Sequence, residues 1–223
     1  VLEGLFGAYK KIVSTRELID QNFLSQLSIK CIVLQYSEEE CKFVKQHHKM
    51  YQSEYEYLCQ HQKRNRFIKN LALSLKGNTI VMFQRVETHG VPLFAQIQAE
   101  AKVPTYFVSG KVDGDERERI RKIVNTHKDS ITVSSVGTFS QGVNIPNINN
   151  IIVASPTKSQ IRVFQTIGRG LRKSETKYHC VLYDIVDDLH YKSRLNYSRM
   201  LFIERLEIYC TEHFDFCILN VPF

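Results

Sequence analysis

The sequence predicts an α/β fold: a mostly parallel central sheet with helices on both faces, plus a small C-terminal helix–strand extension. From Ile29 onward, short apolar runs alternate with longer helical patterns, which is typical of such a sheet. Most of these runs are continuously apolar, as expected of strands that are covered on both sides. A chain of 223 residues, 43% of them hydrophobic and 24% charged, is long enough to bury a sizeable core.

Six strands are predicted from apolar runs, most of them rich in valine and isoleucine. They are Ile29–Gln35, Thr79–Phe83, Thr105–Val108, Ile131–Ser134, Ile151–Ala154 and Cys180–Ile185. The connections between these runs carry apolar residues at helical spacing. The first such helix carries an apolar stripe from Phe67 to Leu75 and should end at Gly77, which suits a left-handed cap. Two more are expected, one with a stripe from Leu93 to Ala101 and one over Asp115–Asn125.

Two segments depart from this alternation. The stretch Tyr36–Gln62 is polar and is either a solvated helix or an insertion. It contains a basic cluster formed by Lys42, Lys45, His47, His48 and Lys49. After Asp188, an amphipathic pattern over Leu201–Tyr209 is followed by the alternating apolar residues Phe214, Phe216 and Ile218. We therefore predict a C-terminal extension, residues 191–223, packed on the main domain.

The formal charge of +7 and the pI of about 9.1 favour a polyanionic partner such as nucleic acid. Two basic clusters fit this partner, and each is either part of a nucleic-acid track or, more often for such runs, a solvated face. The clusters are Lys63, Arg64 and Arg66, and Arg117, Arg119 and Arg121. The tyrosines Tyr51, Tyr55 and Tyr57 are expected to pack rather than to stack on bases.

The cysteines show neither a C-x-x-C pair nor a histidine at zinc-ligand spacing, so no metal site is expected. They are Cys31, Cys41, Cys59, Cys180, Cys210 and Cys217. We expect reduced, mostly buried thiols. The sequence shows neither a secretory signal nor a membrane-spanning run, so no membrane contact and a cytoplasmic location are predicted.

The segment Gln165–Arg172 carries the most informative chemistry. On a helix, Gln165, Arg169 and Arg172 share one polar stripe. An arginine is permanently charged and binds phosphate oxygens in a forked geometry, and charge develops on the γ-phosphoryl group during ATP hydrolysis. Gly168 and Gly170 each cost a helix roughly 1 kcal/mol relative to alanine, which indicates that close backbone approach is needed. By itself this stripe also fits a solvated helix face.

This segment resembles motif VI, Q-x-x-G-R-x-x-R, of the superfamily-two helicases. At the right distance upstream, Ser135–Pro146 resembles motif V, in which a Ser or Thr contacts the nucleic-acid backbone and a Gly-x-Asp segment faces the nucleotide. Those roles fall on Ser135, Gly142 and Asn144, and Asn144 replaces the usual acid, which weakens ribose or metal-linked contacts there. Val81–Arg85 resembles motif IV, and the run Phe107-Val108-Ser109-Gly110 resembles the adjoining backbone-contacting turn.

The resemblance implies a RecA-like fold and assigns roles to eleven residues. Catalysis falls on Arg169 and Arg172; ATP binding on Gln165, Gly142, Asn144 and Gly168; DNA binding on Ser135, Ser109, Gly110, Gln84 and Arg85. It also divides the chain into a crossover from a first motor domain (1–28), a second RecA-like domain (29–190) and the extension (191–223). We therefore expect the N-terminal motor domain of the same protein to be a partner.

Within the superfamily, the chain resembles the recombination helicases of T-even-type phages. The matching segments are Gly4–Gly7, Val13–Leu18, Lys63–Arg66, Gly137–Ser140 and Asp184–Leu189. This resemblance implies an ATP-driven motor that remodels forks, junctions and displaced-strand structures in recombination and repair. DNA, branched or single-stranded, is the implied partner, and RNA in hybrids stays open.

The chain has no G-x-x-x-x-G-K-[ST] phosphate loop of its own, and no matching acid pair. We therefore predict that ATP and Mg²⁺ are held mainly by the first motor domain and that this chain alone is inactive. Asp187 and Asp188 end a strand and are predicted to form a solvated turn or a helix cap.

Two other functions stay in view. One is a non-catalytic nucleic-acid-binding or annealing module with a helicase-like fold. The other is a different doubly wound protein, such as a dinucleotide enzyme, which needs a glycine-rich loop after the first strand. Gln35–Glu38 offers no such loop.

Overall fold

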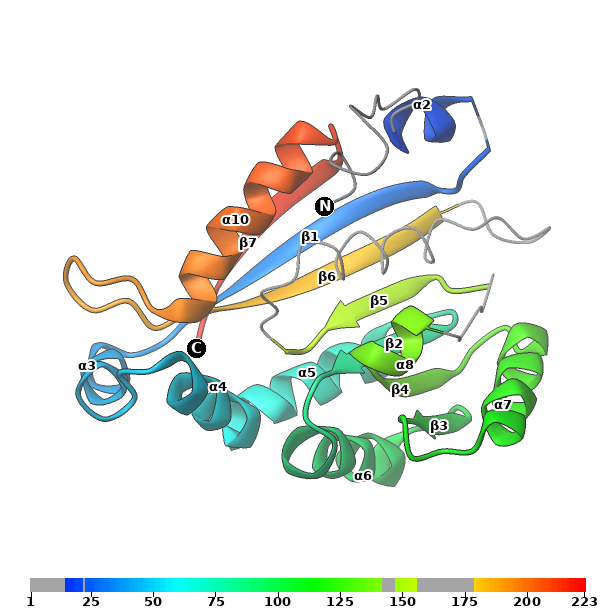
Figure 1. Cartoon of the computed structure of the whole chain (residues 1–223), viewed down its shortest axis with the longest axis horizontal. Helices are drawn as coiled ribbons and strands as arrows, with labels where there is room; N and C mark the ends of the chain where they lie inside the picture. The colour runs from blue at the N-terminus through cyan, green and yellow to red at the C-terminus, as the bar shows by residue number, and fades with distance from the viewer. Residues whose placement is uncertain (1–14, 22, 142–146, 156–178) are drawn as a thin grey trace, which may run out of the picture.

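The computed structural model describes residues 15–21, 23–141, 147–155 and 179–223. They form one seven-stranded sheet in the order β3-β4-β2-β5-β6-β1-β7, and every neighbouring pair is parallel (Figure 1). The strands are β1 Gln26–Gln35, β2 Thr79–Phe83, β3 Thr105–Val108, β4 Ile131–Ser135, β5 Asn150–Val153, β6 His179–Asp188 and β7 Asp215–Pro222. The predicted α/β class with a parallel sheet is confirmed.

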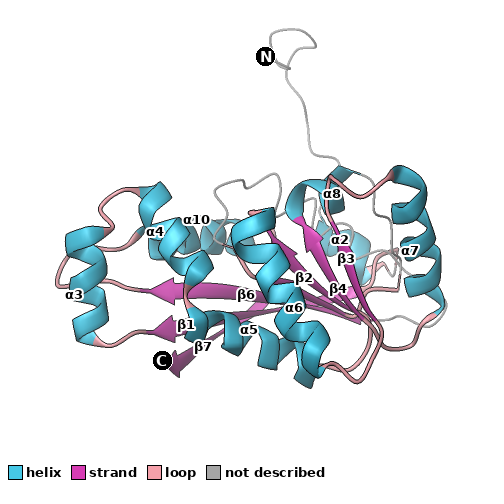
Figure 2. Cartoon of the chain, turned by 90° about the horizontal axis from the view of Figure 1, so that it is seen from below, coloured by secondary structure: helices cyan, strands magenta, loops and turns pink. Residues whose placement is uncertain are grey.

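Helices cover both faces of this sheet (Figure 2). They are α2 Thr15–Asp20, α3 Glu38–His47, α4 Tyr51–Gln60, α5 Gln62–Ser74, α6 Val91–Glu100, α7 Gly114–Thr126, α8 Val136–Gln141 and α10 Tyr197–Thr211, with a π-helix at Val86–Gly90. One buried cluster joins the sheet to α2, α7 and α10, and the other joins it to α3, α4, α5 and α6. In β1, Cys31 and Val33 belong to the first cluster and Leu34 to the second, because successive side chains point to opposite faces.

The polar stretch after β1 forms two helices, α3 and α4, followed directly by α5. Cys41 and Val44 anchor α3 in the core, so this stretch is more than a solvated helix. The helix predicted over Phe67–Leu75 is present as part of α5, but it ends at Ser74 with an extended cap residue. Gly77 does take a left-handed φ of 87°, in the turn into β2 rather than at the helix end.

Strands β1 and β6 are longer than their neighbours and project at the carboxyl edge. They pair over ten residues, up to Gln35 opposite Asp188. The next strand, β5, ends at Val153 opposite Asp184. At about 3.3 Å per residue, β1 and β6 therefore extend roughly 13 Å beyond β5.

The C-terminal residues complete the same sheet. Strand β7 pairs in parallel with β1, from Ser28 opposite Asp215 to Gln35 opposite Pro222. Helix α10 buries Phe202 and Tyr209 in the core cluster that contains α7.

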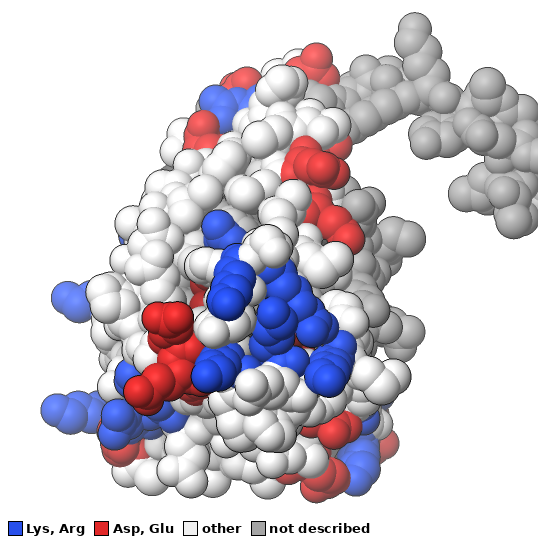
Figure 3. Space-filling view, turned by 90° about the vertical axis from the view of Figure 1, so that its left-hand side faces the viewer, with Lys and Arg blue, Asp and Glu red and all other residues white. Residues whose placement is uncertain are grey.

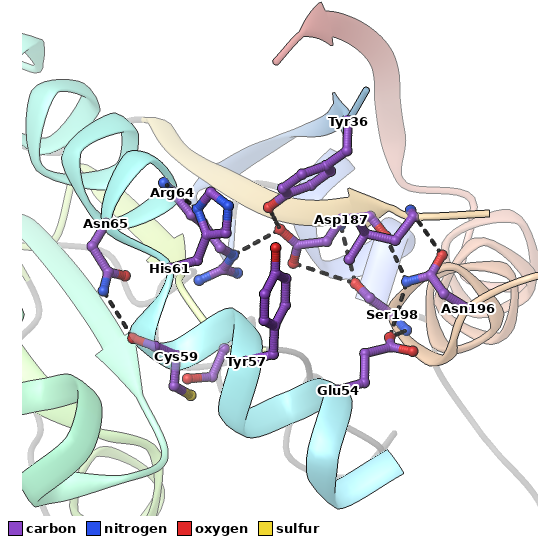
Figure 4. Close-up of polar contacts among 12 residues, drawn as sticks. Tyr36, Glu54, Tyr57, Cys59, His61, Arg64, Asn65, Asp187, Asn196 and Ser198 are labelled. Carbon is purple, nitrogen blue, oxygen red and sulfur yellow. Dashed lines mark hydrogen bonds and ion pairs between the residues drawn. The ribbon is translucent and has the colours of Figure 1, made fainter. Parts of the chain in front are cut away.

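The prediction for Asp187 and Asp188 was wrong. Both residues lie within β6, and Asp187 is completely buried. One carboxyl oxygen of Asp187 accepts hydrogen bonds from Arg64 Nε at 2.7 Å and from the Tyr36 hydroxyl at 2.8 Å (Figure 4). The Asp187 backbone N–H donates to Ser198 Oγ at 3.0 Å. A buried charge needs such partners, and pairing with Arg64 offsets the cost of burying the Asp187 carboxylate within β6.

Arg64 is equally buried. It therefore belongs neither to a nucleic-acid track nor to a solvated face, the two interpretations given for its basic cluster. A second buried pair lies three residues earlier in β6. Arg205 of α10 contacts both carboxyl oxygens of Asp184, at 2.8 and 2.9 Å, and Tyr209 donates a third hydrogen bond at 3.0 Å. Burial alone lowers the pKa of the Arg205 guanidinium, but the charge of Asp184 raises it above its ordinary value. Both pairs therefore fix helices to β6.

Four of the cysteines are buried, namely Cys31, Cys41, Cys59 and Cys180, and two are exposed, namely Cys210 and Cys217; all are free thiols. The prediction that the cysteines are mostly buried is confirmed. Within the described ranges, the helices are too short or too polar to cross a membrane.

Candidate nucleic-acid interface

Three turns at the carboxyl edge of the sheet lie side by side. They follow β2, β3 and β4, which are direct neighbours in the order β3-β4-β2. Phe83 at the end of β2 pairs with Ser135 of β4, and Val108 at the end of β3 pairs with Ser134, so the turns begin at nearly the same level. The five predicted DNA-binding residues of these turns therefore share one edge, where open α/β sheets place their ligands.

The β2 turn exposes Gln84 and Arg85. Its backbone is held from below, because the Gln84 N–H donates to Ser155 Oγ at 3.2 Å, just beyond the end of β5. Gly90 closes the π-helix directly over β2: a Cβ atom there would lie 2.5 Å from the Phe83 ring. A π-turn packed this tightly is frequent at functional sites and fixes the direction in which Gln84 and Arg85 point.

His89 and Ser155 support this turn and were not predicted from the sequence. Both are buried, and His89 Nδ1 lies 3.1 Å from Ser155 Oγ. Burial, with the positive charge of Arg64 as a smaller cause, lowers the pKa of His89 to about 3. The imidazole is therefore neutral near pH 7 and positions Ser155 without adding charge. An isolated histidine and serine 66 residues apart give no signal in the sequence.

In the β3 turn the backbone rather than the side chain is accessible. Ser109 is buried, whereas Gly110 is exposed and a Cβ atom built on it would meet nothing within 4 Å. Lys111 Nζ pairs with Glu87 Oε1 of the π-helix at 2.6 Å, which joins the β3 turn to the β2 turn. A ligand reaching this turn meets the main chain at Gly110.

In the β4 turn the predicted contact residue has a structural task. Ser135 is 9% exposed, its Oγ lies 2.7 Å from Thr138 Oγ1, and it accepts a hydrogen bond from the Thr138 N–H at 3.3 Å. A hydroxyl that accepts from the N–H three residues later caps a helix, here α8. The exposed position of this turn is Gly137, where a Cβ atom would also meet nothing.

The remaining predicted site residues lie outside the described residues. They are Gly142, Asn144, Gln165, Gly168, Arg169 and Arg172. The chain leaves β5 at the carboxyl edge with Ser155 and is described again from His179. Over the described ranges, no three His, Cys, Asp or Glu side chains are grouped so as to hold a metal ion.

A family model, the helicase conserved C-terminal domain, matches residues 62–174, which is half of the chain. The chain belongs to this family. It is also 33% identical to the ATP-dependent DNA helicase uvsW of Enterobacteria phage T4, over 98% of this chain and 45% of that protein. The chain thus spans about half the length of this relative. The superfamily-two resemblance predicted from the motifs is confirmed, together with its phage branch.

Solved structures agree with the sequence comparisons. The crystal structure of T4 UvsW matches with a TM-score of 0.77 at 33% identity, over 89% of this chain and 42% of that chain. The C-terminal domain of the DEAD-box protein Dbp5 matches with a TM-score of 0.56 at 12% identity, over 88% of this chain and 90% of that chain, which shows the fold alone. The fold is therefore the RecA-like fold of helicase C-terminal domains.

Proposed function

We propose that this chain is the second motor domain of an ATP-dependent DNA helicase that remodels branched DNA in recombination and repair. The observation that carries the proposal is the row of β2, β3 and β4 turns on one edge of a helicase-type sheet. The relationship to the phage T4 helicase, which is named for DNA, supports DNA as the polymer.

In this proposal the turns grip the phosphate backbone of one strand. Gln84 and Arg85 supply side-chain donors, and the exposed main chain at Gly110 and Gly137 allows close approach. Such contacts carry no sequence information and weaken with salt, which suits a motor that moves along any sequence. Ser109 is buried, and Ser135 acts by holding α8 in place.

ATP, when bound, supplies the phosphoryl transfer that drives the motor. We place ATP and Mg²⁺ between this domain and the first motor domain of the same protein, which carries the phosphate loop. Gln165, Gly168, Gly142 and Asn144 would face the nucleotide, and Arg169 and Arg172 would stabilise the charge that develops on the γ-phosphoryl group. Closing and reopening of the two domains then makes and breaks the DNA contacts.

The test uses the intact helicase and measures DNA-stimulated ATP turnover and DNA affinity separately. Arg169→Ala and Arg172→Ala should each lower turnover by at least about 100-fold, because such arginines contribute about 10³ to 10⁵ to turnover. DNA affinity should stay within about threefold of wild type. Arg119→Ala is the control, since Arg119 of α7 is paired with Glu116 in the same helix, and it should change neither quantity.

Unchanged turnover in both arginine variants would remove the arginine assignment. An intact protein that anneals strands but shows no DNA-stimulated turnover would instead favour the non-catalytic module. The present chain by itself should hydrolyse no ATP, and robust turnover by it would show a second nucleotide site.

A further inference from the structure

A basic surface lies at the projecting ends of β1 and β6, away from the three turns. It consists of Lys45, Lys49, Lys192 and Arg194 around Tyr191, and we refer to it as the Tyr191 patch. Lys45 and Lys49 come from the end of α3 and the residues after it, and the others come from the turn between β6 and α10. Lys and Arg side chains gather on this end of the molecule (Figure 3).

Contacts within the patch hold its cations close together. Lys45 Nζ and Lys192 Nζ lie 5.2 and 5.7 Å from the centroid of the Tyr191 ring. Arg194 Nη2 donates to the Lys49 carbonyl at 3.2 Å. A small hollow between the two segments is lined by Lys45, His48, Glu54 and Arg194, among other residues.

Among the described residues, the cations of the patch form no ion pairs with the acids around it. Within the described part of the chain, none of the four cations is within ion-pair distance of a carboxylate. Glu54 is buried behind the patch, where its oxygens accept from Asn196 and from the backbone N–H groups of Tyr197 and Ser198. Asp188 is 2.7 Å from His190 Nδ1.

The other basic run, on α7, is different. Arg119 is bound to Glu116 and Arg121 to Glu118, each by two hydrogen bonds within one turn of the helix. Their charges cancel locally, so α7 offers a polyanion much less than the Tyr191 patch does.

The backbone of the patch carries a second sign of a specific role. Lys192 has a φ of 54° in the tight turn closed by the Tyr191–Arg194 bridge. Glycine or asparagine adopts this left-handed conformation with less strain than lysine. Strain of this kind is tolerated where a side chain is needed for function.

Helix α4 lies between the patch and the β2 turn. Helix α4, which carries Tyr51, packs against the π-helix Val86–Gly90 of the β2 turn. The Tyr51 ring is 5.8 Å from the Tyr197 ring, and the Tyr197 hydroxyl donates to the Lys49 carbonyl at 3.3 Å. Helix α4 thus links the patch to the π-helix of the β2 turn.

We propose that the Tyr191 patch binds the phosphate backbone of a duplex arm of the DNA substrate, beyond the strand gripped by the three turns. The proposal rests on the proposed function. Strand β1 lies three strand spacings from β2 and projects roughly 13 Å further, which puts the patch on the order of 20 Å from the β2 turn. Phosphates several nucleotides further along therefore reach it.

Duplex DNA fits better than a single strand because of Tyr191. Proteins that hold single strands stack bases on aromatic rings, whereas Lys45 and Lys192 are drawn to the Tyr191 ring and leave it poorly available for a base. The available chemistry is that of exposed ammonium and guanidinium groups, which recognise backbone phosphates.

The experiment compares fork DNA with a single strand of equal nucleotide number, in the intact helicase. The Lys45→Gln/Lys192→Asn variant should bind the fork about 5- to 20-fold more weakly, and the slope of log affinity against log salt should fall by about two. Single-strand affinity and turnover saturated with single strands should stay unchanged. Asparagine is tolerated at the left-handed position, so folding should be preserved.

The Arg119→Gln/Arg121→Gln variant is the control, since it removes the same two charges from α7 and should leave fork affinity within about twofold. Equal losses in both double variants, or no loss in the patch variant, would overturn the proposal. An equal loss on single strands would assign the patch to the translocated strand and overturn its duplex role. Failure of the motor proposal is distinguishable, since the wild-type protein would then lack DNA-stimulated turnover.

Discussion

Strand β6 connects two regions in which basic side chains have opposite surroundings. Along the strand, Asp184 and Asp187 hold Arg205 and Arg64 in the buried interior. Just beyond its end, Lys49, Lys192 and Arg194 of the Tyr191 patch are exposed to solvent. The difference shows that a basic residue becomes structural or available for binding according to the carboxylates that face it in the folded chain.

A run of four residues makes the same point. Lys63 and Arg66 are exposed, whereas Arg64 between them is fully buried. All three of these side chains are basic, but helix α5 directs only Arg64 toward β6. Counting basic residues in a window therefore overestimates the surface available to DNA.

The strongest test of this comparison removes one arginine from each region. Arg205→Met should lower the free energy of unfolding by about 3–5 kcal/mol, because it leaves Asp184 buried without its cation. Arg194→Met in the patch should change it by less than about 0.5 kcal/mol. Urea unfolding measures both changes in the free energy of unfolding, provided that the variants and the wild type have equal m values. Similar losses in the two variants would contradict the distinction between buried structural arginines and surface cations. The double variant Arg205→Met/Asp184→Leu, which removes both buried charges, should recover part of the stability.

A second test concerns His89, a buried side chain that could carry a positive charge but is bonded to Ser155 and not to a carboxylate. The pKa of His89 is about 3 in the folded chain and 6.5 for the free group, so the unfolded chain takes up a proton first. This contribution to stability is complete above pH 6.5 and is lost as the pH falls toward 3. At about 1.4 kcal/mol per pKa unit, the loss is on the order of 3 kcal/mol at pH 4.

The measurement is the difference in pH dependence between wild type and His89→Gln, which lacks the titrating ring. The unfolding free energy of wild type should fall more steeply between pH 6.5 and pH 4. A wild-type imidazole that shows the NMR shifts of the charged ring at pH 5 would contradict the buried neutral state, whatever the stability of the variant.

The smallest expected effect separates strain from charge within the patch. Lys192 and His213 share a φ of 54°, and both are exposed. Lys192→Asn and His213→Asn should each raise the free energy of unfolding, by up to about 1 kcal/mol, since asparagine suits this conformation. Only Lys192→Asn should weaken binding to fork DNA. If both variants weaken it equally, loss of the Lys192 ammonium group is not the cause.

The sequence by itself determined the apolar framework. Strands Thr79–Phe83 and Thr105–Val108 were predicted with their observed bounds, because continuous apolar runs between turn residues have few alternatives in a sheet covered on both faces. Motif spacing likewise identified the helicase family from the sequence alone. It also placed Gln84, Arg85 and Gly110 at strand ends, where the structure has them.

Only the tertiary structure decided the fate of the polar residues. Arg64 pairs with Asp187, which is 123 positions away in the sequence, and the Ser135 hydroxyl caps α8. Lys192, in the turn after β6, shares the Tyr191 ring with Lys45 of helix α3. Apolar periodicity reports which side of an element is buried, because burial depends on summed area and not on a particular partner. A charge or a hydroxyl depends on one partner at hydrogen-bond distance, and that distance exists only once the chain has folded.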